Sequence, residues 1–366
     1  MSMDFGEVVP VAAAAPRPVE VIEAPVGDVV LKVEDLTVRF PSDEGPVKAV
    51  QNLSYEARLG RTLAIVGESG SGKSVSSMTV LGLHNPARTF ISGSVMLDGE
   101  EIVGASEATL RKLRSAKVAM VFQDPQSSLH PFYKVGSQIA EAYLAHHRVS
   151  KAVARKRAVE MLDLVGIPNP DRRAKQYPHE FSGGMRQRAM IALGLVNDPL
   201  LLIADEPTTA LDVTVQAQIL DLIADLKKEF GSAVILITHD LAVVAEVSDD
   251  ILVMYAGRAV ERGLTRDVLS RPNHPYTWGL LQSLPSASED ADSLKAIRGA
   301  PPSLVHLPPG CSFHPRCDFQ DLVACMSQLP ELRSVGPGRL IRCHLATPDE
   351  TLNPEAALID HQEISS

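Results

Sequence analysis

The sequence of 366 residues lacks the features that would place it in a membrane or on nucleic acid. It has no apolar stretch long enough to cross a bilayer, and its first residues lack the pattern of a signal peptide. Lys and Arg number 35 against 45 Asp and Glu, and this net charge of −10 argues against nucleic acid or anionic lipid as the main partner. We therefore expect a cytoplasmic chain that serves any pore through other polypeptides.

Cysteine is absent from the first 310 residues, and all four cysteines lie between Cys311 and Cys343. In a reducing cytosol such a cluster is more often a metal site than two disulfides. Four thiolates can hold either a tetrahedral Zn²⁺ or a 4Fe–4S cluster. The spacing C-x5-C-x7-C-x17-C contains neither the close cysteine pairs of structural zinc sites nor a ferredoxin run, so spacing alone leaves the metal open.

Composition divides the chain into four parts. Residues 1–28 are rich in Ala and Pro and predict a disordered tail. Residues 29–284 carry the regular patterns of an α/β unit, and residues 285–346 form a loop-rich extension with the four cysteines. Residues 347–366 are acidic, without Lys or Arg, and predict a flexible tail. No internal repeat is present, so the central unit occurs once.

Short apolar runs alternate with helical patterns in the central unit. The runs expected as strands buried on both faces of a parallel sheet are Leu63–Val66, Val118–Phe122, Leu200–Ala204 and Val234–Ile237. The expected helices are Val75–Leu83, Lys151–Val165, Met185–Val196 and Val213–Phe230. The alternating stretch Val29–Phe40 predicts a half-exposed antiparallel strand. Strands alternating with helices predict an α/β layered fold.

A phosphate-binding loop follows the first of these strands. Gly67-Glu-Ser-Gly-Ser-Gly-Lys73-Ser74 matches G-x-x-x-x-G-K-S/T between a strand and a helical pattern. Its glycines let successive backbone N–H groups point at one phosphate, and the next helix presents its positive end to the same anion. Lys73 is expected to reach the β- and γ-phosphates, and the Ser74 hydroxyl to bind Mg²⁺.

Two carboxylates end a buried strand at Leu200-Leu-Leu-Ile-Ala-Asp205-Glu206. Acids at such a place are costly unless a cation faces them, and Mg²⁺ would supply that charge. We expect Asp205 to hold the metal and Glu206 to act as the general base toward the attacking water.

Phe181-Ser182-Gly183-Gly184-Met185-Arg186-Gln187 resembles the signature of the ABC ATPases, with Phe and Met where Leu and Gln are usual. The resemblance implies an ABC nucleotide-binding domain, with a P-loop core similar to RecA, an antiparallel β subdomain and a helical subdomain at about 105–185. It also implies that the signature binds ATP held by another ATPase subunit. Gln123 resembles the residue that touches Mg²⁺ and senses the permease, Asp212 the D-loop residue, and His239 the γ-phosphate switch.

The ATP site implied by the resemblance draws on several segments. Phe40 stands where the family stacks an aromatic ring on adenine. The catalytic residues would be Lys73, Gln123, Glu206 and His239, and Mg²⁺ would be held by Ser74, Gln123 and Asp205. The remaining ATP contacts would be Ser69, Gly70, Ser71, Gly72, Val75, Ser182, Gly183, Gly184 and Asp212.

Asn273-His-Pro-Tyr-Thr277 and the segment around Cys311 and Cys343 resemble the C-terminal extension of the dipeptide and oligopeptide importer ATPases. That family implies two different permease subunits, a sister ATPase, an extracytoplasmic peptide-binding protein and a place on the cytoplasmic face of the membrane. It also favours a 4Fe–4S cluster on Cys311, Cys317, Cys325 and Cys343, in a structural rather than redox-sensing role, with zinc as the alternative.

Three other functions stay open at this stage. A soluble ABC ATPase of DNA repair or translation would usually carry a coiled-coil insertion or a second cassette, and this sequence has neither. A P-loop kinase would not need Ser182-Gly183-Gly184 together with Gln123 and His239. An importer of a nickel chelate is not separated from a peptide importer, because the ATPase does not contact the solute.

Overall fold

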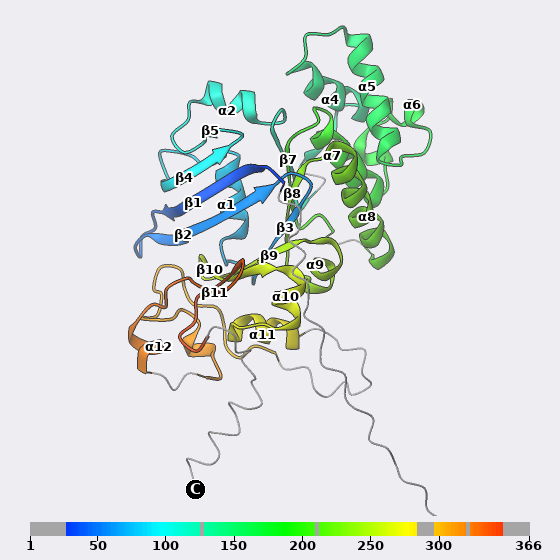
Figure 1. The fold of residues 1–366 in the computed structure, drawn as a ribbon. Helices are drawn as coiled ribbons and strands as arrows, with labels where there is room; N and C mark the ends of the chain where they lie inside the picture. The colour runs from blue at the N-terminus through cyan, green and yellow to red at the C-terminus, as the bar shows by residue number, and fades with distance from the viewer. Residues whose placement is uncertain (1–26, 125–127, 209–211, 284–295, 320–322, 347–366) are drawn as a thin grey trace, which may run out of the picture.

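The computed structural model describes residues 27–124, 128–208, 212–283, 296–319 and 323–346. The tails expected at 1–28 and 347–366 lie outside these ranges, except for Gly27 and Asp28. Within them the chain forms two sheets and a group of helices at one end of the larger sheet (Figure 1).

The smaller sheet is antiparallel and has the order β2-β1-β4-β5. Its long central strand β1 has the predicted bounds Val29–Phe40. The other strands are β2 (Val47–Arg58), β4 (Phe90–Leu97) and β5 (Glu100–Glu101). The apolar residues of β1 and β2 enter one buried cluster with those of β3 in the larger sheet, so the two sheets share a core.

The larger sheet has eight strands in the order β11-β12-β10-β9-β3-β8-β7-β6. Strands β6, β7, β8, β3 and β9 are parallel, and β10, β12 and β11 continue the sheet in antiparallel fashion. The predicted apolar runs are confirmed as β3 (Thr62–Val66), β6 (Val118–Val121), β7 (Leu201–Asp205) and β8 (Ala233–Thr238), all buried. The others are β9 (Asp250–Tyr255), β10 (Arg258–Leu264), β11 (Arg333–Gly336) and β12 (Arg339–Ile341).

The four predicted helices are present as α1 (Lys73–Val80), α5 (Lys151–Leu164), α7 (Gly183–Leu195) and α8 (Val213–Phe230). The described residues of the central unit also form α2 (Glu107–Leu113), α4 (Val135–Leu144), α6 (Pro170–Arg173), the 3-10 helix η1 (Pro178–Glu180), α9 (Leu241–Val247), α10 (Thr265–Ser270) and α11 (Pro275–Gln282). Helices α4, α5 and α6 project together beside α7 (Figure 1). The span 105–185 expected for this helical part also takes in β6, which pairs with β7 in the larger sheet.

The C-terminal extension is built onto the central unit. Its strands β11 and β12 pair with each other, and β12 pairs with β10. Its short helices are η3 (His314–Arg316) and α12 (Val323–Ser327). Phe313 and Phe319 share a buried cluster with Tyr255 and Tyr276 of the central unit. Within the described ranges, no helix is both long and apolar enough to span a membrane.

Candidate functional site

The phosphate loop, residues 67–74, leaves the buried strand β3 and turns into α1. Gly67 has φ +152° and Gly72 has φ +101°, conformations that side chains rarely adopt. A Cβ atom at Gly67 would overlap the Met254 carbonyl oxygen, and one at Gly72 would overlap that of Ala49. The Ser71 hydroxyl is buried and has no hydrogen-bond partner among the described residues. The loop thus needs glycine at these positions and offers an unpaired polar group, which fits a phosphate-binding cradle.

Lys73 is buried in this loop, and its Nζ donates to the carbonyls of Gly67 at 2.7 Å and Glu68 at 2.9 Å. Burial lowers the pKa of Lys73, and the carboxylates of Glu206 and Asp205 oppose that effect. Burial also raises the pKa of Asp205, opposed by a hydrogen bond from Ser74 and increased by the charge of Glu206. One cation therefore faces two acids in a partly dehydrated place, as a metal–phosphate site requires.

Glu206 lies between the side chains of Gln123 and His239, and the three residues follow adjacent strands. It follows β7, has φ +45°, and is held by its N–H to the Ile237 carbonyl at 2.9 Å. Gln123, after β6, donates its amide to Glu206 Oε2 at 2.9 Å. His239, after β8, brings Nδ1 to 3.4 Å from Glu206 Oε1. These strands are neighbours and parallel, so the sheet itself brings their carboxyl ends together.

A cavity of about 770 Å³ connects these groups. Most residues predicted from the sequence line it: Phe40, Ser69, Gly70, Ser71, Gly72, Lys73, Ser74, Val75, Gln123, Glu206 and His239. Sequence reasoning missed Val47, Ala49 and Leu304, which also line it. None of the three carries a motif, and Leu304 belongs to the extension. Asp205 is not a lining residue, but its carboxylate accepts a hydrogen bond from Ser74, which is one.

The signature residues do not border this cavity. Ser182 caps α7 by accepting the Met185 N–H at 3.3 Å, and Ser182 and Gly183 are exposed. Asp212 is also exposed and caps α8 by accepting the Val215 N–H at 3.0 Å. Ala210 and Leu211, which precede Asp212 in the sequence, lie outside the described residues. Two capped helix starts therefore face solvent, separate from the phosphate loop.

The residues expected around Mg²⁺ suit that ion. The Ser74 hydroxyl, the Asp205 carboxylate and the Gln123 amide offer oxygen ligands, which Mg²⁺ prefers. The Ser74–Asp205 hydrogen bond and the approach of Gln123 to Glu206 keep all three next to the phosphate loop.

The expected four-cysteine metal centre is not supported by the arrangement of the side chains. All four cysteines are free thiols, and among the described residues no group of three or more His, Cys, Asp or Glu is placed to hold a metal ion. Burial raises the pKa of Cys317 to about 12 and that of Cys343 to about 11. Cys317 packs as a small apolar group in a cluster with Phe313 and Phe319, and Cys343 does so in a cluster with Ile341.

Comparison with known families finds two matches. The family described as ABC transporter matches residues 50–209. The family described as oligopeptide/dipeptide transporter, C-terminal region, matches residues 260–325. The first range contains the phosphate loop, Gln123 and Glu206, and the second contains Tyr276 and Cys317.

Individual relatives extend over most of the chain. It is 50% identical over 316 residues to the oligopeptide transport ATP-binding protein OppD of Escherichia coli, covering 86% of this chain and 93% of that protein. It is 44% identical over 332 residues to the dipeptide transport ATP-binding protein DppD of Bacillus subtilis, covering 90% and 93%. A solved ATP-binding cassette, a dimer bound to ADP and Pi after hydrolysis, is 28% identical with a TM-score of 0.58, covering 64% of this chain and 99% of that one. The chain therefore belongs to the ABC transporter ATPases and, within them, to the ATP-binding subunits of oligopeptide and dipeptide transporters.

Proposed function

We propose that this chain hydrolyses ATP to power the import of dipeptides or oligopeptides, with the residues around the 770 Å³ cavity as its active site. The observation that carries the proposal is the meeting of Gln123, Glu206 and His239 beside the phosphate loop. A nickel chelate importer would use the same machinery, but the similarity to OppD and DppD favours peptides.

Each side chain has a distinct part in the reaction. Lys73 moves from the loop carbonyls to the β- and γ-phosphates, and Phe40 stacks on the base. Glu206 polarises a water, takes its proton, and so lets the water oxygen bond to the γ-phosphorus while the bond to the β–γ bridging oxygen breaks. ADP and phosphate result. Gln123 and His239 orient Glu206 and the γ-phosphate. Ser74, Asp205 and Gln123 would hold Mg²⁺, which would supply positive charge beside the phosphate oxygens.

The exposed signature calls for a second ATPase subunit. Ser182, Gly183 and Gly184 form a helix start that can receive an anion, yet they lie away from the cavity of their own chain. We propose that they bind ATP held by a sister ATPase, with Asp212 at the same interface. Binding of ATP then closes the heterodimer, and hydrolysis reopens it.

The permease subunits have a suitable surface on this chain. An apolar groove of about 560 Å³ is lined by residues of β6 and α7 and of the segments just after α1 and β6, among them Leu83, Phe122 and Met190. Phe132 and Tyr133, in the segment after Gln123, are 81% and 59% exposed. We propose that two different permeases dock through such grooves on this chain and its sister. That arrangement places the chain on the cytoplasmic face of the membrane, with a peptide-binding protein on the other side.

The four cysteines have the donor chemistry for a 4Fe–4S cluster, and we propose that cluster as a structural staple of the extension. Its support is the donor set and one backbone contact, the Cys311 N–H donating to the Cys325 carbonyl at 2.9 Å. Chain purified without oxygen should contain iron and sulfide. Zinc in their place would leave a metal staple of another kind, and the absence of both would reject the proposal.

Glu206→Gln, introduced together with the matching change in the sister subunit, tests the assignment in the assembled transporter. The variant is expected to bind ATP but to lose peptide-stimulated phosphate release by a factor of about 10³. Glu160→Gln is the matched control, because Glu160 pairs with the exposed Lys156 on α5 and does not line the cavity. Unchanged phosphate release in the Glu206→Gln complex would sink the proposed role of Glu206.

A further inference from the structure

The C-terminal extension reaches the back of the phosphate loop through one ion pair. Glu68, the second residue of the loop, does not line the nucleotide cavity. Its two carboxylate oxygens accept from Arg316 of the extension, from Nη1 at 2.7 Å and from Nη2 at 3.0 Å. The Arg316 side chain is 6% exposed and the Glu68 side chain is 25% exposed. Such a paired contact fixes direction as well as distance, because the guanidinium and the carboxylate are both planar.

The Glu68 backbone is held from the same side. Its N–H donates to the Tyr276 hydroxyl at 2.8 Å. Tyr276 lies on α11 and is fully buried, with its ring centroid 4.6 Å from that of Tyr255 and 5.4 Å from that of Phe313. A ring packed on two others has little freedom to follow a moving loop. Glu68 is therefore fixed at both its side chain and its backbone.

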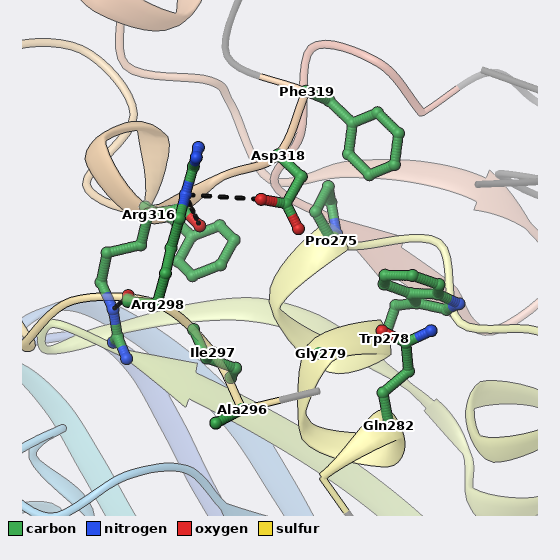
Figure 2. A pocket seen from close by; sticks show the side chains of 11 residues that line it. Pro275, Trp278, Gly279, Gln282, Ala296, Ile297, Arg298, Arg316, Asp318 and Phe319 are labelled. Atoms are coloured by element: carbon green, nitrogen blue, oxygen red, sulfur yellow. Dashed lines mark hydrogen bonds and ion pairs between the residues drawn. The ribbon is translucent and has the colours of Figure 1, made fainter. Parts of the chain in front are cut away.

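Arg316 is itself held in place. Its Nε donates to the Arg298 carbonyl at 2.8 Å, and Arg298 returns bonds to the carbonyls of Arg316 and Cys317. The Nη1 of Arg316 also donates to the Tyr255 hydroxyl at 3.3 Å. Figure 2 shows Arg298 and Arg316 next to each other on the wall of a cavity of about 210 Å³ between α11 and the extension. The guanidinium that meets Glu68 is thus a pre-set group rather than a mobile surface side chain.

A second segment of the extension touches the nucleotide cavity from its other end. Leu304 lines that cavity together with Phe40 and Val47. The Leu304 carbonyl accepts the Lys48 N–H at 3.0 Å, which fastens this segment to the start of β2. The extension therefore reaches the site at two places, at the cavity wall that Leu304 shares with Phe40 and behind the loop proposed for the phosphates.

From these contacts we propose that Arg316 is a positioning residue of the nucleotide site, holding the phosphate loop through Glu68 in the shape that receives ATP. The inference rests on the proposed ATP site and goes beyond it, because it gives the extension a part in nucleotide binding that needs no metal. The Glu68 carbonyl also accepts from the Lys73 Nζ, so the residue that Arg316 holds is in direct contact with a residue of the phosphate site.

The test compares Arg316→Gln, Glu68→Gln and the double variant in the assembled transporter. Either single change should raise the KM for ATP about tenfold and lower kcat less than twofold, because it loosens the loop without removing a reacting group. The double variant should be no worse than the single ones, because both remove the same contact. Arg316→Lys should recover part of the loss, since an ammonium keeps the charge without the paired geometry.

Arg339→Gln is the matched control. Arg339 also joins the extension to the central unit through a buried ion pair, to Glu261 at 2.8 Å, but it does not touch the loop. Its variant should keep the KM for ATP within twofold. A KM raised equally by Arg339→Gln would show general loosening of the extension and overturn the proposal. So would an unchanged KM in folded Arg316→Gln and Glu68→Gln.

Two readouts distinguish the loss of the Glu68–Arg316 contact from other causes of a raised KM. Glu68→Gln breaks the contact from the loop side, so its effect cannot come from a disturbed Cys317. Equilibrium binding of ATP to the full chain measures the loop even if hydrolysis fails. A folded wild-type transporter that does not hydrolyse ATP would count against the proposed function. An ATP affinity that neither substitution changes would count against the proposed role of Arg316 alone.

Discussion

Acid is expected to destabilise this protein partly through one buried histidine, and His274→Asn tests that expectation. His274 is 1% exposed, and its Nδ1 accepts the Tyr276 N–H at 3.1 Å at the start of α11. The pKa of His274 is lowered to about 3, chiefly by burial and also by the charge of Arg342, against a backbone hydrogen bond with Arg342 that raises it. The folded protein therefore keeps this ring neutral well below neutral pH.

In the unfolded chain the same ring has a pKa of about 6.5. As pH falls from 6.5 toward 3, the unfolded state binds a proton that the folded state refuses, so the stability contributed by the neutral ring is lost in that window. Two pH units below 6.5, at pH 4.5, the free energy of unfolding should have fallen by about 2.5 kcal/mol from its value at pH 7.

Asparagine offers an oxygen near the position of Nδ1 but does not titrate, so it can keep the cap of α11 and remove the proton. Urea unfolding monitored by pulse proteolysis, at pH 7 and pH 4.5, gives the two free energies for each protein. All other titratable groups are the same in both proteins. The loss of unfolding free energy on acidification, compared between the two proteins, therefore isolates the contribution of His274. The wild type should lose about 2.5 kcal/mol more than His274→Asn on acidification. Equal losses would refute the reasoning.

Two further substitutions probe the loop and the buried ion pair. Gly67→Ala should weaken ATP binding at least about tenfold, measured with a fluorescent analogue, because its Cβ would overlap backbone. Gly60 also has a positive φ but has open space around it, so Gly60→Ala should leave ATP binding unchanged. An equal loss of ATP binding in Gly60→Ala would show that backbone strain, and not overlap with the loop surroundings, causes the loss. Glu261→Ala removes the buried carboxylate that accepts from Arg339 and from the backbone N–H groups of Asn273 and His274, and it should cost about 3–5 kcal/mol in urea unfolding. Glu160→Ala, from an exposed pair, should cost less than about 1 kcal/mol, and similar losses would contradict the role of burial.

The regular elements were predictable because their signals are local. Helix α8 has the predicted bounds Val213–Phe230, with Asp212 capping its start and Gly231 at φ +64° ending it. The parallel strands were readable as apolar runs because both their faces are covered. The three strand ends carrying Gln123, Glu206 and His239 then meet because these strands are neighbours in the sheet.

The contacts behind the phosphate loop could not be predicted in this way. Glu68 and Arg316 are 248 residues apart, and neither belongs to a motif whose chemistry names a partner. Leu304 lies in a segment without periodicity, so nothing in its neighbourhood indicates that it lines the nucleotide cavity. Long-range pairs of this kind depend on how the extension packs, and that packing leaves no repeat in the sequence.

The sequence interpretation of the extension depended on its cysteines. It did not identify the strands and side chains that attach the extension to the central unit. Strands β11 and β12 have four and three residues, too few for a periodic signal, yet they continue the sheet that carries the active site. A metal staple was expected to compensate for a segment too small to fold alone. Pairing with β10 and the shared packing of Phe313 and Tyr276 supply part of that stability without a metal.

This continuity determines how the extension can be studied. Removing residues after 284 would uncover Tyr255 and Tyr276, which are 2% and 0% exposed, and leave the outer edge of β10 unpaired. Such a truncated chain would lose the Arg316 contact, the Leu304 wall and the shared core at once, and a loss of ATP binding would have no single cause. Point substitutions at Glu68, Arg316 and Arg339 separate these effects, because each changes one side chain and leaves the strand pairing of the extension in place.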